Sequence, residues 1–211
     1  WVFQHAKIAW GSLLQASTRV VFSQYDLQKG VLVLDDSDKV RSRNTSKIAC
    51  VHKVKDKKTG GWFNGQEFIF LILVTDTLTI PVGFRFYNPD PSIKAWRKTR
   101  KAQIKSGVPV KDRTKKPKLN PAYPSKQTIA LQLLEEFSKN HPNIAVQAVL
   151  ADALYGNTKF MDQAAHVTSC SQVISQLRKN QLVLSRGKKI SLTNYFERNE
   201  GVKSTLKVRG S

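Results

Sequence analysis

The chain has 211 residues, 40% of them hydrophobic, which is enough for one well-buried domain and would cramp a second independent core. Lysine and arginine number 35 against 15 acidic residues, and the resulting formal net charge of +20 favours a nucleic-acid partner over a merely soluble basic surface. No apolar run approaches the about 18 residues of a membrane span, and Cys50 and Cys170 lack the cysteine neighbours of a zinc site or disulfide framework.

The first 30 residues predict a helical lead-in, the remnant of an N-terminal region, because their apolar residues have partial helical spacing. The chain opens on Trp1 without an initiator methionine, so we expect it to be a piece of a longer protein. Residues 31–34 are apolar and predict a short strand that stops in the acidic cluster 35–38.

Residues 53–64 predict a basic hairpin arm, in which Gly60 and Gly61 allow a sharp turn before the next strand. The runs 67–74 and 78–86 flank a short polar turn and predict an antiparallel hairpin. Residues 96–118 are rich in lysine and arginine and are interrupted by glycine and proline, which predicts a mobile insertion without packed structure.

The second half of the chain alternates between helix and strand patterns. Residues 125–140 predict a helix with a capping-type start, and residues 144–150 predict a buried parallel strand that ends at Asp152. Residues 158–165 predict a short helix and 172–177 another strand. The tail, 178–211, predicts short β segments with turns at 186–187 and 199–201 and no helix.

Three strands, a helix, a strand, a helix and a strand form the order of the ribonuclease H-like fold, an α/β mixed sheet flanked by helices. In that sheet the first and fourth strands are neighbours, so Asp36 and Asp152 should lie near each other. Two carboxylates about 5 Å apart repel by about 3 kcal/mol at an effective dielectric of 20, and a divalent cation removes this cost. The structural alternative makes Asp36 a turn residue and Asp152 a helix N-cap.

Five segments in this order resemble bacterial insertion-sequence DDE transposases, over roughly residues 31–211. They are Leu-Asp-Asp-Ser-Asp, Gly-Gly-Trp-Phe-Asn-Gly, Ile-Pro-Val-Gly-Phe, Leu-Ala-Asp-Ala-Leu-Tyr-Gly and Ile-Ser-Gln-Leu-Arg. The resemblance, to the group with a Tyr-Arg-Glu-Lys signature, implies Asp36 and Asp152 as catalytic residues and ligands of Mg²⁺ or Mn²⁺. Asp35 is the reserve for Asp36, because it is adjacent and points to the opposite face of a regular strand.

In the family pattern Tyr-x-x-Arg-x-x-x-Glu, a glutamate is the third acidic residue. Tyr195 and Arg198 fit this pattern, but Val202 stands where the glutamate should be. We therefore expect a catalytic-domain fragment that is inactive alone, with its third ligand beyond Ser211. The expected domains are the lead-in 1–30, a ribonuclease H-like core 31–180 with a basic insertion 96–120, and the start of a truncated β insertion, 181–211.

The resemblance implies metal-dependent DNA strand cleavage and strand transfer during transposition. The implied partners are double-stranded DNA at transposon ends and target and, at full length, a second copy of the chain; the expected location is the cytoplasm, at the nucleoid, without a membrane. Two alternatives stay open: an inactive DNA-binding remnant, or a self-sufficient ribonuclease H-like nuclease that uses Glu197 or Glu200. The residues expected to contact phosphates are Lys53, Lys55, Lys57, Lys58, Arg178 and Lys179.

Overall fold

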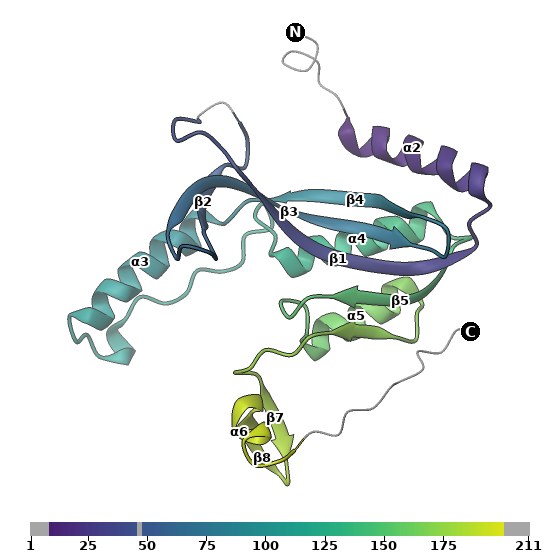
Figure 1. Cartoon of the computed structure of the whole chain (residues 1–211). Helices are drawn as coiled ribbons and strands as arrows, with labels where there is room; N and C mark the ends of the chain where they lie inside the picture. The colour runs from purple at the N-terminus through teal and green to yellow at the C-terminus, as the bar shows by residue number, and fades with distance from the viewer. Residues whose placement is uncertain (1–8, 46–47, 201–211) are drawn as a thin grey trace.

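A computed structural model describes residues 9–45 and 48–200 of the chain (Figure 1). A six-stranded mixed sheet forms its centre, and a separate two-stranded sheet follows near the C-terminal end. In chain order the elements are α2 (Trp10–Tyr25), β1 (Lys29–Val40), β2 (His52–Lys55), β3 (Trp62–Val74), β4 (Thr79–Tyr87), α3 (Pro91–Lys105), the 3-10 turn η1 (Val110–Asp112), α4 (Lys126–Asn140), β5 (Ala145–Ala151), α5 (Thr158–Thr168), β6 (Val173–Ser175), β7 (Leu182–Ser185), β8 (Lys188–Ser191) and α6 (Leu192–Phe196).

The strand order of the main sheet is the one expected for a ribonuclease H-like fold. β1 lies between β3, to which it is antiparallel, and β5, to which it is parallel. β4 pairs with the second part of β3, and β6 runs parallel to β5. The predicted neighbourhood of the first long strand and the strand before Asp152 is thereby confirmed.

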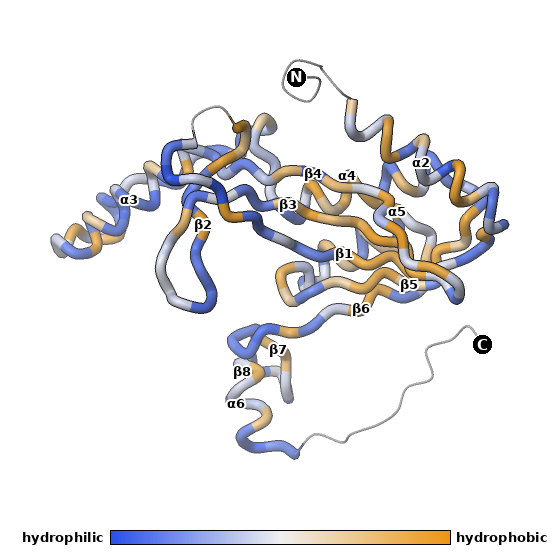
Figure 2. Tube along the Cα trace, turned by 45° about the horizontal axis from the view of Figure 1, so that its top comes forward, coloured by the Kyte–Doolittle hydropathy of each residue, from blue (hydrophilic) through white to orange (hydrophobic). Residues whose placement is uncertain are grey.

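Alternating residues of the central strands form the core under α4 and α5. Leu32 and Leu34 of β1 and Ile69 and Leu71 of β3 are at most 2% exposed. They pack with Leu133 and other apolar residues of α4, and Figure 2 shows the apolar residues gathered in these central strands and adjoining helices. Burial of this face fixes the register, because a slip of one residue would turn every core side chain to the opposite face.

β1 is longer than its apolar run predicts, which corrects the expectation that the strand stops before the aspartates. Pairing with β3 continues from Val31 to Val40, so Asp35 and Asp36 lie inside a strand. The backbone of β3 supplies hydrogen-bond partners along this whole stretch, which outweighs the low strand propensity of aspartate. The predicted basic arm is likewise partly strand: β2 and β3 flank a turn in which Gly60 has φ +72°.

The cationic segment is also structured, contrary to the sequence prediction. α3 starts behind Asp90, whose side chain accepts a hydrogen bond from the Ser92 amide, and Pro91 occupies its first turn. Its lysine, arginine, alanine and glutamine residues are good helix formers, which the charge pattern alone obscured. The following segment folds back along the helix, since Trp96 Nε1 donates to the Thr114 carbonyl at 2.9 Å.

The tail contains the predicted short strands but also a helix, which corrects the expectation of none. β7 and β8 form a hairpin whose turn residues, Arg186 and Gly187, both have positive φ, as the predicted turn requires. The five-residue helix α6 then starts at Ser191, whose side chain accepts from the Asn194 amide. Within the described ranges 9–45 and 48–200, no helix is long and apolar enough to cross a membrane.

Gly156, in the loop after β5, is predicted to tolerate no side chain. A Cβ there would lie 2.5 Å from the backbone oxygen of Gln176, so Gly156→Ala should lower the free energy of unfolding by about 1–3 kcal/mol. Gly11→Ala is the matched control: nothing lies within 4 Å of its Cβ, and alanine favours helix α2. Urea unfolding of both variants checks this, and equal stability of the two would contradict it.

Candidate active site

The carboxylate of Asp36 is held from two sides by segments distant in sequence. Lys126, the first residue of α4, donates to Oδ2 at 2.7 Å, and the Tyr155 hydroxyl donates to Oδ1 at 2.5 Å. Asp36 faces these groups because it shares the α4 side of β1 with Leu32 and Leu34. Its side chain is 16% exposed, so the ion pair with Lys126 is only weakly screened.

Lys126 joins Asp36 to a second carboxylate, that of Glu67. The ammonium donates to Glu67 Oε1 at 2.8 Å, and the other oxygen of Glu67 lies 2.8 Å from His52 Nε2. Burial alone would lower the pKa of Lys126, but the hydrogen bonds to the two carboxylates raise it above its ordinary value. For Glu67, burial would raise the pKa, but hydrogen bonds from Lys126 and His52 lower it. We call Asp36, Glu67, Lys126, Tyr155 and His52 the carboxylate network.

Asp152 lies beside this network. The parallel pairing of β1 with β5 extends as far as Leu34 and Ala151. Asp152 is therefore level with Asp35, the residue before Asp36. Burial raises the pKa of Tyr155, as do its hydrogen bond to Asp36 and the negative charges of Asp36, Asp152 and Asp35. The hydroxyl therefore stays protonated, and it lies within the field of all three aspartates.

Asp152 also has a local structural role, since its Oδ1 accepts a hydrogen bond from the Leu154 amide at 2.8 Å. The N-cap of α5 is Asn157, so the structural alternative for Asp152 as a helix cap is wrong, although a turn role is present. Asp36 is inside β1 and is not a turn residue. The second oxygen of Asp152 has no hydrogen-bond donor among the described residues, and the side chain is exposed.

The oxygen donors fit a hard divalent cation, but a lysine is bound to one of them. Asp36 already accepts one positive group, Lys126, and carboxylate oxygen is the ligand type that Mg²⁺ and Mn²⁺ prefer. Across residues 9–45 and 48–200, no three His, Cys, Asp or Glu side chains are grouped to hold a metal ion. A cation that took the place of the ammonium at Oδ2 of Asp36 would displace Lys126.

The six residues expected to contact phosphates lie on two surfaces. Lys53 and Lys55 are exposed on β2, and Lys57 and Lys58 lie in the turn that follows. Arg178 and Lys179 follow β6, where Arg178 Nε donates to the Ala153 carbonyl at 3.0 Å. Arg178 thus braces the loop that carries Asp152, a contact that sequence reasoning did not foresee.

The third acidic residue is not brought into the site by the described residues. Glu197 is the C-cap of α6, and both it and Glu200 are exposed; Val202 lies outside the described residues. Tyr155, Lys126, Glu67 and His52 are network members that the sequence analysis missed. Tyr155 lies inside the quoted Leu-Ala-Asp-Ala-Leu-Tyr-Gly segment, and Glu67 shares a face of β3 with the buried Ile69, so both left a signal.

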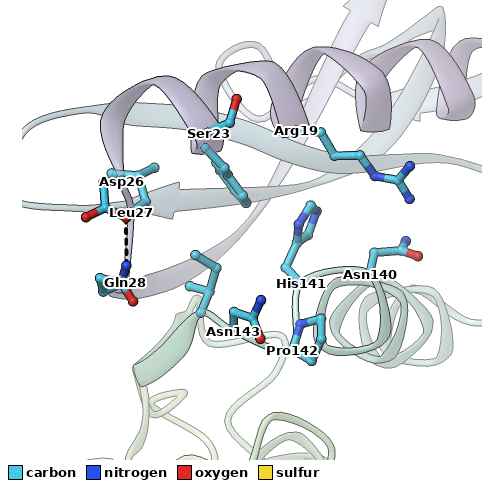
Figure 3. Close-up of a pocket in the computed structure, with 11 residues that line it drawn as sticks. Arg19, Ser23, Asp26, Leu27, Gln28, Asn140, His141, Pro142 and Asn143 are labelled. Atoms are coloured by element: carbon cyan, nitrogen blue, oxygen red, sulfur yellow. Dashed lines mark hydrogen bonds between the residues drawn. The ribbon is translucent and has the colours of Figure 1, made fainter.

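A cleft of about 290 Å³ lies at the opposite end of β1 (Figure 3). It is lined by Arg19 and Phe22 of α2, by residues before β1, and by residues 140–144 at and after the end of α4. His141 packs against Phe22 there, and burial together with the charge of Arg19 lowers its pKa. Gln28, on its wall, is eight residues from Asp36, which is roughly 26 Å along an extended strand. The cleft is therefore separate from the carboxylate network.

The chain matches the model of a protein family described as DDE superfamily endonuclease over residues 2–206. This match spans nearly all of the 211 residues and includes every element of the carboxylate network. Members of this superfamily typically use divalent metal ions. No curated protein and no solved structure matches the chain.

Replacing Glu67 by glutamine is predicted to change how stability depends on pH. The pKa of Glu67 is lowered on folding, so the ionised carboxylate stabilises the fold above about pH 4.5 and this contribution is lost as pH falls through the lowered value. Glu67→Gln should cost about 1–3 kcal/mol at pH 7 and flatten the decline of the unfolding free energy below pH 5. Urea unfolding across pH checks this.

Glu135→Gln, which changes an exposed carboxylate of α4 in the same way, is the control and should leave stability at pH 7 almost unchanged. If the Glu67 and Glu135 variants have the same stability and the same acid dependence as the unaltered chain, Glu67 is not a member of an energetically coupled network.

Proposed function

Because the chain belongs to the DDE superfamily of endonucleases, we propose that it is the catalytic domain of an insertion-sequence transposase. The reaction is metal-dependent DNA strand cleavage and strand transfer. The observation that supports this most strongly is the position of the Asp36 carboxylate. It is fixed inside β1, beside Asp152, where the parallel pairing of β1 with β5 ends.

Asp36 and Asp152 would hold the divalent cation, with Asp35 as the reserve for Asp36. When bound, Mg²⁺ or Mn²⁺ would supply an activated water or DNA hydroxyl for in-line attack at phosphorus and stabilise the departing oxygen. Tyr155 orients Asp36 by its hydrogen bond to Oδ1. Lys126 compensates the charge of Asp36 until the cation is bound and then stays close to Glu67, where its charge can face a phosphate.

The positive charge of the chain is placed to hold a DNA duplex near these carboxylates. α3 carries six lysines and arginines, has no acidic residue and buries none of its side chains. It extends away from the sheet on the same side as the β2 hairpin, which carries Lys53 and Lys55 (Figure 1). Exposed cations of this number bind the phosphate backbone with strong salt dependence and without reading sequence.

The proposed partners are double-stranded DNA at the transposon ends and at the target, and a second copy of the chain in the full-length protein. The proposed site of action is the bacterial nucleoid in the cytoplasm. Net charge and α3 support the DNA partner. The dimer and the location stay predictions.

Divalent metal binding is predicted to require both Asp36 and Asp152. Calorimetric titration with Mn²⁺ should show binding to the chain, and Asp36→Asn and Asp152→Asn should each weaken it at least tenfold, because each removes an anionic oxygen ligand. Asp76→Asn, in the exposed turn between β3 and β4, is the control and should bind as the unaltered chain does. Asp35→Asn decides the reserve assignment: a loss in this variant with none in Asp36→Asn would move the ligand to Asp35.

The same variants test the reaction itself. Supercoiled plasmid should be nicked by the full-length protein in the presence of Mg²⁺, and nicking should be lost in its Asp36→Asn and Asp152→Asn variants. DNA binding without any nicking would favour the inactive remnant over the nuclease. Nicking that persists in the Asp152→Asn variant would contradict the proposed site.

Lys126→Met is predicted to have opposite effects on stability and on metal affinity. Without metal, Asp36 and Glu67 lose their shared counter-ion, so the melting temperature should fall. With Mn²⁺, Oδ2 of Asp36 no longer has to release an ammonium, so affinity should rise and saturating Mn²⁺ should raise the melting temperature more than in the unaltered chain. Mn²⁺ affinity that is unchanged or weaker would show that Lys126 does not compete with the cation.

A further inference from the structure

Four phenylalanines form a groove on the face of the sheet opposite α4. Phe68 and Phe70 of β3 lie across from Phe86 and Phe84 of β4, and all four line a cavity of about 290 Å³ together with Lys39 and Arg41. Ile69 and Leu71, which alternate with the β3 phenylalanines, point to the core instead. We call Phe68, Phe70, Phe84, Phe86, Lys39 and Arg41 the aromatic groove.

The rings contact one another but not the hydrophobic core. Their centroids are 4.9 to 6.3 Å apart from ring to ring, mostly edge to face. None of the four belongs to the core cluster or packs against it, and Phe86 is 43% exposed. The contacts of the groove within the described chain therefore do not account for four aromatic side chains on an open sheet face.

The rim of the groove is positively charged at its end away from Asp35. Lys39 and Arg41 make no ion pair among the described residues, and Arg41 is oriented by its Nε, which donates to Gln66 Oε1 at 2.8 Å. In the β1–β3 register, Asp35 is opposite Phe70, Ser37 opposite Phe68 and Lys39 opposite Gln66. The groove thus begins beside Asp35, on the face of the sheet opposite to Asp36, and ends at two cations.

Flat apolar rings can stack on nucleic-acid bases, and cations without an ion pair can contact phosphates. The groove therefore matches a nucleic-acid strand. Nucleotides in one strand of a duplex rise only about 3.4 Å each, whereas the ring centroids of Phe68 and Phe70 are 4.9 Å apart and the two rings are edge to face. The rings therefore do not match the parallel, stacked bases of a duplex. A duplex keeps its base faces stacked inside and cannot offer them to phenylalanine.

We propose that the aromatic groove binds unpaired nucleotides of a DNA strand. The inference rests on the proposed function only in taking DNA as the substrate. The bases stack on the phenylalanine rings, and Lys39 and Arg41 contact phosphates. Such binding tolerates any sequence, because every base has a flat face. The groove would hold one strand open on the face of the sheet opposite to Asp36, while α3 and the hairpin of β2 and β3 hold the duplex.

Fluorescence anisotropy with three labelled probes tests the groove: a thymidylate dodecamer, an abasic strand with the same phosphates, and a blunt duplex. The chain should bind the thymidylate strand about tenfold or more tightly than the abasic strand. Phe68→Leu/Phe86→Leu should abolish this preference and leave duplex affinity within twofold. Trp62→Ala, which removes an aromatic residue 66% exposed elsewhere on β3, is the control and should keep the preference. Lys39→Gln/Arg41→Gln should weaken both single strands equally.

Circular dichroism and thermal unfolding establish that the variants fold. If the double variant does not fold, the single variant Phe86→Leu replaces it. Equal binding of thymidylate and abasic strands by the unaltered chain would overturn the groove as a base site. A leucine variant that keeps the preference would also overturn it. If the leucine variant instead dissociates a dimer in sedimentation and keeps strand binding, the groove is an interface between copies. Duplex binding and metal-dependent nicking can survive each of these failures, so the proposed function is judged separately.

Discussion

The ion pair between Asp36 and Lys126 is the interaction on which the candidate site depends. A carboxylate that is 16% exposed needs a charged or hydrogen-bonding partner, and Asp36 has both, from Lys126 and Tyr155. These partners come from the start of α4 and the loop after β5, so the same contacts fix both segments against β1. The geometry around Asp36 thus depends on the positive charge of Lys126, which one divalent cation could replace.

This arrangement explains why the network extends beyond the catalytic candidates. Lys126 must be held when Asp36 releases it, and Glu67 supplies the second carboxylate that holds it, itself bound to His52. Tyr155 remains a hydrogen-bond donor because burial and three nearby aspartates raise its pKa. Metal binding would then exchange one cation for another and leave the fold of the sheet intact.

Much of the core could be predicted from sequence, because apolar periodicity reflects burial. The 67–74 run, the helix at 125–140 and the strand before Asp152 are where alternation and helical spacing placed them. The end of β1 could not be predicted, because its pairing with β3 decides it. Helix α3 was missed, although Asp90 and Pro91 are a local start signal in the sequence. Charge composition indicated a binding surface in both cases but carries little information about backbone conformation.

The site was predictable only in part, since sequence order indicates which strands are neighbours but not which side chains meet. Asp36 and Asp152 follow from the order of the strands, whereas the contact of Lys126 with Asp36 spans 90 positions. Such a pairing depends on how α4 packs across the sheet. Asp35 and Asp36 differ only in the face that each presents, and here the register of β1 with β3 turns Asp36 toward α4.

The most direct measurement of the central claim is the anomalous difference density of Mn²⁺ in a crystal of the chain. The account predicts a peak in contact with oxygens of Asp36 and Asp152, with Nζ of Lys126 moved away from Asp36 Oδ2 and still bound to Glu67. A peak that contacts neither aspartate, or an Asp36–Lys126 pair that stays closed at saturating Mn²⁺, would contradict it.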